Sequence, residues 1–242
     1  MDINFIQIGI VLVIILLSMT LHEAMHAFVS YWLGDETAKR EGRLTLNPLK
    51  HIDPFLTIIL PITLALLHAP IFGGAKPVPF RPDQVKWGDW GAALVALGGP
   101  LTNLVLAFIG FGVFVISGAP VTSDFAFVAL TFVQVNLGFF LFNIIPLPPL
   151  DGSRVLYALA PEPVRVGMRW LEQYGIFLIF GIVLLFNSIL YAYMSNGVSF
   201  FIEISLQFSA FLNSICKNSL RFRCYNYKYQ TRHLGVHDFP IS

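Results

Sequence analysis

Long apolar segments separated by short polar linkers dominate the pattern of this chain. The first segment, residues 3–33, has no charged residue before His22, and a helix needs about 20 apolar residues to cross the roughly 30 Å hydrocarbon layer of a bilayer. Three segments of similar character and one weaker apolar stretch follow, at 91–117, 125–145, 174–194 and 197–215. The pattern therefore predicts an all-α polytopic membrane protein.

The first apolar segment could instead be a cleaved signal peptide. A signal peptide requires a basic start and a cleavage site of small residues. This chain begins Met1-Asp2-Ile3-Asn4-Phe5, and its apolar run continues unbroken to His22. We therefore expect a helix that is retained in the membrane.

The apolar segment 55–72 differs from the others, because Pro61 interrupts it and Pro70 closes it. It lies between two polar linkers, 35–54 and 73–90. In the first linker the alternation Arg43-Leu44-Thr45-Leu46 predicts a short strand. We therefore expect a short membrane-associated strand or a re-entrant region here, between the first two helices of the core.

The composition supports a membrane protein and excludes some partners. Hydrophobic residues make up 56% of the chain and charged residues only 12%, against about 25% charged in an ordinary soluble domain. The net charge of +1, without a basic stripe, argues against nucleic acid. We divide the chain into a membrane-embedded domain, 1–195, and residues 196–242, a weakly apolar segment with a polar, basic C-terminal tail.

A pair of histidines near the end of the first segment carries the sharpest chemical signal, His22-Glu23-Ala24-Met25-His26. Residues four apart share one face of a helix, so both imidazoles can bind one zinc ion. Glu23 can then take a proton from water that the metal activates. The alternative is a chance motif that caps the wet end of a membrane helix. Ionisable side chains at this depth are costly and usually functional, which favours catalysis.

A catalytic zinc site normally has three protein ligands, so one must come from elsewhere. Asp151 is the strongest candidate, because it follows an apolar span and the proline-rich stretch 143–150. Broken backbone at membrane depth needs protein or a water-filled cavity around it, so a carboxylate there is expected to face an internal site. His51 and His68 are alternative ligands, and Asp151 could also cap a helix that starts at Gly152.

Three motifs in this order resemble the site-2 protease family of intramembrane zinc metalloproteases. They are His22-Glu23-x-x-His26, Gly99-Pro100-Leu101-x-Asn103 and Asn143-x-x-Pro146-x-x-Pro149-x-Asp151-Gly152. The resemblance covers residues 10–190 and implies a three-helix catalytic core with flanking helices. It also implies one Zn2+ per chain, with the metal ligands His22, His26 and Asp151.

The same resemblance implies roles for three more residues. Glu23 would be the general base that activates water. Asn143 would hydrogen-bond the substrate backbone or the developing oxyanion, and Asn103 would line the same cavity. Simple helix–helix packing is the alternative for both asparagines. No PDZ-like or other regulatory domain is recognisable in the sequence, so the resemblance is to a compact form of the family.

One zinc can join His22, His26 and Asp151 only if the ends of two helices meet at one face of the membrane. The span 91–117 must cross between them, so segment 55–72 is expected to make no net crossing. Seven basic residues in the two flanking linkers favour the cytoplasm for both, by the positive-inside rule. We therefore expect an integral protein of the cell membrane, with its active site nearer the cytoplasmic face.

The function expected is hydrolysis of peptide bonds in or near transmembrane segments. The substrate is expected to be a membrane protein or a peptide, and the reaction is expected to take place within the lipid bilayer. One alternative is a metal-ion transporter, which would explain the ligands but not the placement of Glu23 between the two histidines. Another is a zinc-binding membrane scaffold without catalytic activity.

Overall fold

The computed structural model describes residues 5–59, 62–63 and 75–219. These residues form eight α-helices and two short helical turns, and no β-strand is found among them. Four of the helices are long and apolar enough to cross a membrane: α1 (Phe5–Trp32), α4 (Asp89–Ser117), α5 (Asp124–Asn143) and the part Asn187–Gln207 of α9 (Asn187–Ser219). The predicted all-α polytopic fold is confirmed.

Helices α1, α4 and α5 form the core of the molecule, with α4 packed against both of the others. Helix α4 ends at Gly118, whose φ of 62° closes the helix in the left-handed region that glycine favours. Helix α5 begins after Ser123, whose hydroxyl oxygen accepts a hydrogen bond from the N–H of Ala126. The turn between them is short, so α4 and α5 run antiparallel.

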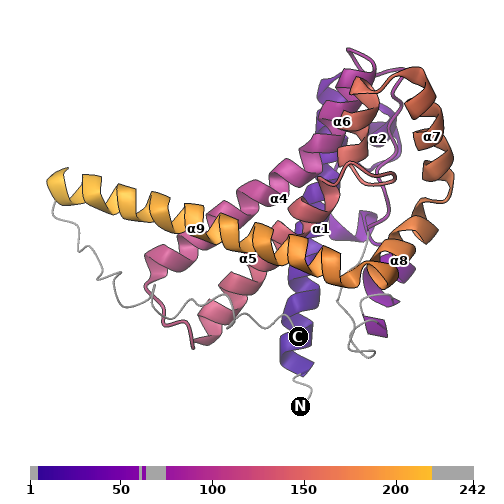
Figure 1. Ribbon diagram of the computed structural model, residues 1–242. Coiled ribbons are helices and arrows are strands. Elements are labelled where there is room, and N and C mark those ends of the chain that lie inside the picture. Colours follow the sequence, from indigo (N-terminus) through magenta and orange to yellow (C-terminus); the bar gives the residue numbers. More distant parts are fainter. Residues whose placement is uncertain (1–4, 60–61, 64–74, 220–242) are drawn as a thin grey trace.

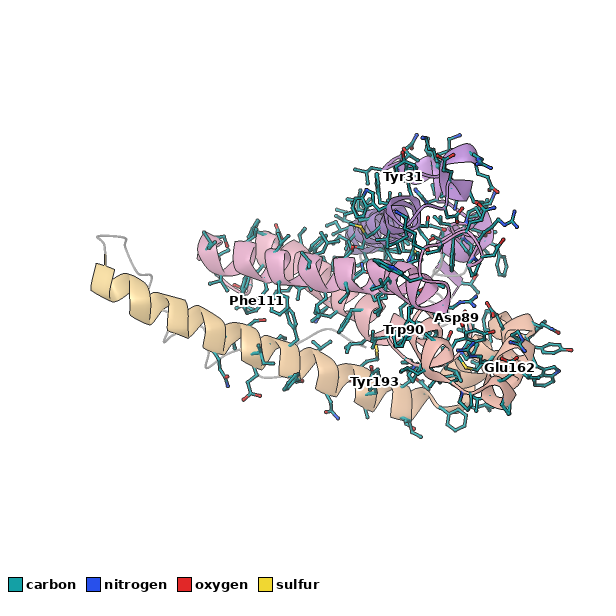
Figure 2. All side chains as sticks on the ribbon, turned by 90° about the horizontal axis from the view of Figure 1, so that it is seen from above. Tyr31, Asp89, Trp90, Phe111, Glu162 and Tyr193 are labelled. Carbon is teal, nitrogen blue, oxygen red and sulfur yellow. The ribbon has the colours of Figure 1, made fainter. Side chains whose placement is uncertain are left out.

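Helix α9 packs against the core at the C-terminal half of α4. Phe201 of α9 contacts Phe111 of α4, edge to face, with a centroid distance of 6.5 Å. Figure 2 shows Phe111 between these two helices. The buried cluster around this pair also contains Ala107, Val133 and Leu137, so it joins α4, α5 and α9.

The predicted span at 174–194 is wrong, because the helix divides at Phe186. Helix α8 (Gly175–Leu185) ends there, and α9 begins with Asn187-Ser188, residue types that favour helix starts over helix interiors. Helices α7 (Glu162–Gln173) and α8 could together form a fifth, sharply bent span. The division of the chain at residue 195 falls inside α9 and stays a prediction.

The shorter elements gather where α1 ends and α4 begins, opposite the N-terminus (Figure 1). They are α2 (Thr37–Arg40), η1 (Pro48–Lys50), α6 (Gly152–Leu159) and α7. An ion pair of 2.7 Å between Arg165 of α7 and Asp89 in the first turn of α4 joins two of these elements. This end of the bundle carries the candidate chemistry.

The short strand predicted at 43–46 is not formed. The N–H of Arg43 donates to Ala38 and that of Thr45 to the carbonyl of Arg43, so these backbone groups bond locally and not across a ladder. Most of segment 55–72 lies outside the described residues. Its start forms the π-helical turn η2 (Pro54–Ile59).

The two linkers that flank this segment lie side by side. The N–H of Lys76 donates to the carbonyl of His51 at 2.9 Å, and the N–H of Arg81 donates to Asp35 at 2.7 Å. Both linkers therefore end at the same end of the bundle, as one zinc shared by His22, His26 and Asp151 requires.

Candidate metal centre

Three side-chain atoms from two distant parts of the chain converge on one point. The Nε2 atoms of His22 and His26 lie 3.0 Å apart. Oδ2 of Asp151 lies 3.2 Å from the first and 3.4 Å from the second. Both histidines are buried, and Asp151 stands at the start of α6, just beyond the end of α5. The structure thus brings together the three residues predicted as ligands.

The protonation of His26 follows from its other ring nitrogen. Its Nδ1 lies 2.7 Å from the backbone carbonyl oxygen of Val95 in α4. A carbonyl oxygen can only accept a hydrogen bond, so Nδ1 carries the proton. In the neutral imidazole, the form that binds metals, Nε2 of His26 has a lone pair that faces Asp151 and His22.

A buried chain of amides fixes the tautomer of His22 in the same way. The carbonyl of Phe132 can only accept, so the atom of Asn136 beside it, at 2.8 Å, is the donor Nδ2. Oδ1 of Asn136 then accepts from Nδ2 of Asn103 at 2.9 Å. Oδ1 of Asn103 faces Nδ1 of His22 at 2.6 Å, so Nδ1 is protonated and Nε2 is the ring nitrogen that faces His26 and Asp151.

With both imidazoles neutral, as metal binding requires, three electron-pair donors face each other. Oδ2 of Asp151 is buried and has no hydrogen-bond partner among the described residues. Such an arrangement is repulsive unless a cation lies at its centre. Zinc bonds of about 2.0–2.2 Å in a tetrahedral site place neighbouring ligand atoms about 3.3–3.6 Å apart, slightly more than the distances of 3.0, 3.2 and 3.4 Å found here. The residues fit a zinc ion.

Glu23 lies beside these residues: one of its carboxylate oxygens and one ring nitrogen from each of His22 and His26 all lie within 4.8 Å of one another. It is half-buried, and its Oε2 accepts a hydrogen bond from the backbone N–H of Val78 at 3.0 Å. Both carboxylates are therefore candidates for a third ligand. Oδ2 of Asp151 lies 3.2 and 3.4 Å from the two imidazole nitrogens, whereas Oε2 of Glu23 is engaged by Val78.

Glycine at position 99 allows α4 to approach the two imidazoles. A Cβ atom at Gly99 would lie 2.5 Å from Nε2 of His22 and 2.5 Å from Nε2 of His26. A second close approach occurs at Gly152, where a Cβ atom would lie 2.2 Å from the carbonyl oxygen of Ile144. The first glycine leaves room for the ligand pair and the second brings α6 against the end of α5.

The other candidates make different contacts or lie outside the described residues. Asn143 is near the end of α5, where its Nδ2 donates to the carbonyl of Phe139 at 3.0 Å. His51 is buried, with Nε2 at 2.9 Å from the carbonyl oxygen of Thr45, and it is not part of the convergent group. His68 lies outside the described residues. Asp151 does take the N-cap position of α6, although its side chain caps no backbone N–H there.

Sequence reasoning missed two residues that act on the site. Asn136 is fully buried and orients Asn103, but it lies in the middle of an apolar span that carries no recognisable motif. The backbone N–H of Val78 holds Glu23, and a backbone contact leaves no mark in residue type. A buried asparagine inside a membrane span was the one available signal, because such a side chain needs partners.

The fold is that of a polytopic helical membrane protein, and one end of it brings together the residue types that hold zinc in metalloproteases. The chain is 40% identical over 193 residues to "Putative zinc metalloprotease YwhC" of Bacillus subtilis, a match that covers 76% of this chain and 84% of the relative. It is 32% identical over 206 residues to "Putative zinc metalloprotease Rip2" of Mycolicibacterium smegmatis, covering 82% and 76%. This chain therefore belongs to the site-2 protease family of zinc metalloproteases. No protein-family model matches the chain, and no solved structure matches it significantly.

Proposed function

We propose that this chain is an intramembrane zinc metalloendopeptidase that hydrolyses peptide bonds in or near the transmembrane segments of other membrane proteins. The observation that carries the proposal is the convergence of His22, His26 and Asp151 with Glu23 beside them. This group lies at one end of a bundle of helices that are apolar enough to cross a membrane. One zinc ion per chain is the proposed cofactor.

The proposed mechanism divides the work between the metal and the protein. When bound, zinc supplies Lewis acidity that polarises the peptide carbonyl and makes water nucleophilic at neutral pH. Glu23 takes the proton of the attacking water and passes it to the amide nitrogen, which leaves as an amine when the C–N bond breaks. Asn143 is proposed to hydrogen-bond the substrate backbone or the oxyanion, since it stands at the end of α5 shortly before Asp151.

The proposed position of the site is in the cytoplasmic half of the cell membrane. Trp32, the last residue of α1, and Trp90, near the start of α4, are both exposed at this end, and tryptophan is enriched at the membrane interface. His26 and His22 precede Trp32 by six and ten residues, which is about 9 and 15 Å along a helix. The basic linkers favour the cytoplasm for this face.

The proposal is tested with purified protein, a model transmembrane peptide and measured zinc content. Wild type should cleave the peptide in a zinc-dependent manner. Glu23→Gln should keep its zinc and lose about 10²–10⁴-fold in rate, because the substitution removes a general base and leaves the ligands in place. Near-normal turnover by the variant would exclude the role given to Glu23. Zinc binding by a wild type without cleavage would favour the inactive scaffold.

A further inference from the structure

Segment 75–80, which forms neither helix nor strand, passes directly beside the proposed general base. The N–H of Val78 donates to Oε2 of Glu23 at 3.0 Å. Pro77 and Pro79 flank Val78 and carry no N–H group, so Val78 holds the single backbone donor of this Pro-Val-Pro sequence. A residue before proline is restricted to extended backbone, which limits the directions that this N–H can take.

The donor is held firmly by packing against the helix that carries the ligands. Val78 is 8% exposed and forms a buried cluster with Ala27 and Ala38. Ala27 directly follows the ligand His26 in α1. The position of the Val78 N–H is therefore fixed by packing against α1, the helix that also carries the imidazoles and Glu23.

Arg43 fixes the segment from the other side. Its side chain is 6% exposed, and its guanidinium donates to the carbonyl oxygens of Lys50, Lys76 and Pro77. The far end of the segment is held where Asp35 accepts the N–H of Arg81 at 2.7 Å. Both ends are thus tied down, which is typical of a fixed support and not of a lid.

We propose that the Val78 backbone N–H is a positioning group for catalysis, and that Arg43 is a positioning residue that acts through it. The hydrogen bond holds Oε2 of Glu23 in one place and leaves Oε1 for proton transfer. Hydrogen bonds to a carboxylate are among the stronger ones in proteins. Glu23 stays half-buried with this bond in place, so the segment leaves the carboxylate accessible. The inference rests on the function proposed above.

The test compares Val78→Pro, which removes the N–H, with Val78→Ala, which keeps it and removes part of the packed side chain. We expect Val78→Pro to retain zinc and KM while kcat falls about 10- to 100-fold, the effect of one hydrogen bond to a charged group. Val78→Ala, which keeps the N–H, should lose clearly less in kcat than Val78→Pro does. The affinity for a small peptide hydroxamate, whose hydroxyl needs the glutamate as partner, should fall in parallel with kcat.

A second pair of variants covers the case in which Val78→Pro does not fold. Arg43→Gln loosens the segment without removing the N–H, and Arg43→Lys keeps a charged donor. We expect a lower kcat and weaker hydroxamate binding for Arg43→Gln, with partial recovery in Arg43→Lys.

Two outcomes would overturn the inference. The first is a zinc-loaded Val78→Pro with unchanged kcat and hydroxamate affinity, which would show that Glu23 does not need the hydrogen bond from Val78. If that variant does not fold, the same result for Arg43→Gln would show it. A faster rate would show that the segment blocks the site. A wild type that binds the hydroxamate but cleaves nothing would contradict the proposed function alone, and the affinity comparison would still decide the role of Val78.

Discussion

The Nδ1 atom of His22 lies 2.6 Å from Oδ1 of Asn103, and this contact connects the metal centre to all three core helices. Asn103 belongs to α4, and it passes the connection to Asn136 of α5. Asn136 in turn donates to Ser18 of α1 at 2.9 Å. Relative displacement of any of these helices would therefore disturb the imidazole that is proposed to bind zinc.

Asn103→Leu should weaken zinc binding about 10- to 100-fold, which is the usual cost of losing a partner that orients a metal ligand. The ring of His22 would lose the acceptor that fixes its tautomer. Metal affinity is measured by competition with a chelator. Ser18→Ala is the matched control, because Ser18 lies at the other end of this series of hydrogen bonds. Its zinc affinity should be close to that of wild type, since Asn136 still donates to the carbonyl of Phe132. Equal zinc affinity in Asn103→Leu and wild type would contradict the orienting role.

Gly99→Ala should lower the zinc content of the purified protein and its activity together. The new methyl group would lie 2.5 Å from the ligand nitrogen of each imidazole, so one ring must move. Gly112→Ala in the same helix is the control, since a Cβ atom there meets nothing within 4 Å. Equal zinc content in Gly99→Ala and the control would contradict this prediction. It would mean that α4 can move away from the two imidazoles to make room for the methyl group.

Asp151→Ala should lose both zinc and activity, because the site would keep only two ligands. His51→Ala should keep its zinc, since the imidazole of His51 contacts the Thr45 carbonyl instead. Zinc content per chain, measured on folded monodisperse protein, separates the two variants. Full zinc content in Asp151→Ala would mean that the third ligand is another residue.

The sequence pointed to three side chains that the structure brings together, because metal binding requires particular residue types at particular spacings. His22 and His26 share a helix face by their separation alone, and Asp151 stood out because it follows a broken apolar span. The strand at 43–46 was predicted from alternation, but Arg43 uses its side chain to hold backbone carbonyls. The roles of Asn136 and Val78 depend on contacts between elements distant in sequence, which a local pattern does not record.

Asp35→Asn should destabilise the end of the bundle that holds the site. The buried carboxylate accepts hydrogen bonds from the N–H and hydroxyl of Thr37 and from the N–H of Arg81. An asparagine side chain would turn its NH₂ toward one of these donors. The expected loss is about 1–3 kcal/mol, the cost of leaving a buried polar group unpaired. It is measured as a lower thermal midpoint in detergent.

The pH dependence of that stability has a definite sign. Burial acts to raise the pKa of Asp35, but the hydrogen bonds from Thr37 and Arg81 outweigh it and hold the pKa below its ordinary value of 3.8. Because the folded-state pKa of Asp35 is lowered, its ionised carboxylate contributes fully to folding stability above the ordinary pKa of 3.8. This contribution is lost as the pH falls toward the folded-state pKa. The midpoint of wild type should therefore drop below about pH 4 more steeply than that of Asp35→Asn. Parallel curves would contradict the assignment.

The topology of the two linkers can be tested without any assay of activity. Single cysteines at Glu41 and Gln84, both exposed, are placed in a background that lacks Cys216 and Cys224. Both should react with an impermeant thiol reagent from the same side, because the N–H of Lys76 donates to the carbonyl of His51 and joins the two linkers. The basic residues of the linkers favour the cytoplasmic side.

A cysteine at Thr122 is the control for the opposite face. Thr122 is exposed in the turn between α4 and α5, one helix length away from the metal centre, so it should react only from outside the cell. If the cysteines at Glu41 and Gln84 reacted from opposite sides, segment 55–72 would cross the membrane. The α1 and α5 ends could then not share one face, and the site of His22, His26 and Asp151 would have to be abandoned. Labelling of both linkers from outside would keep the site and reverse its orientation.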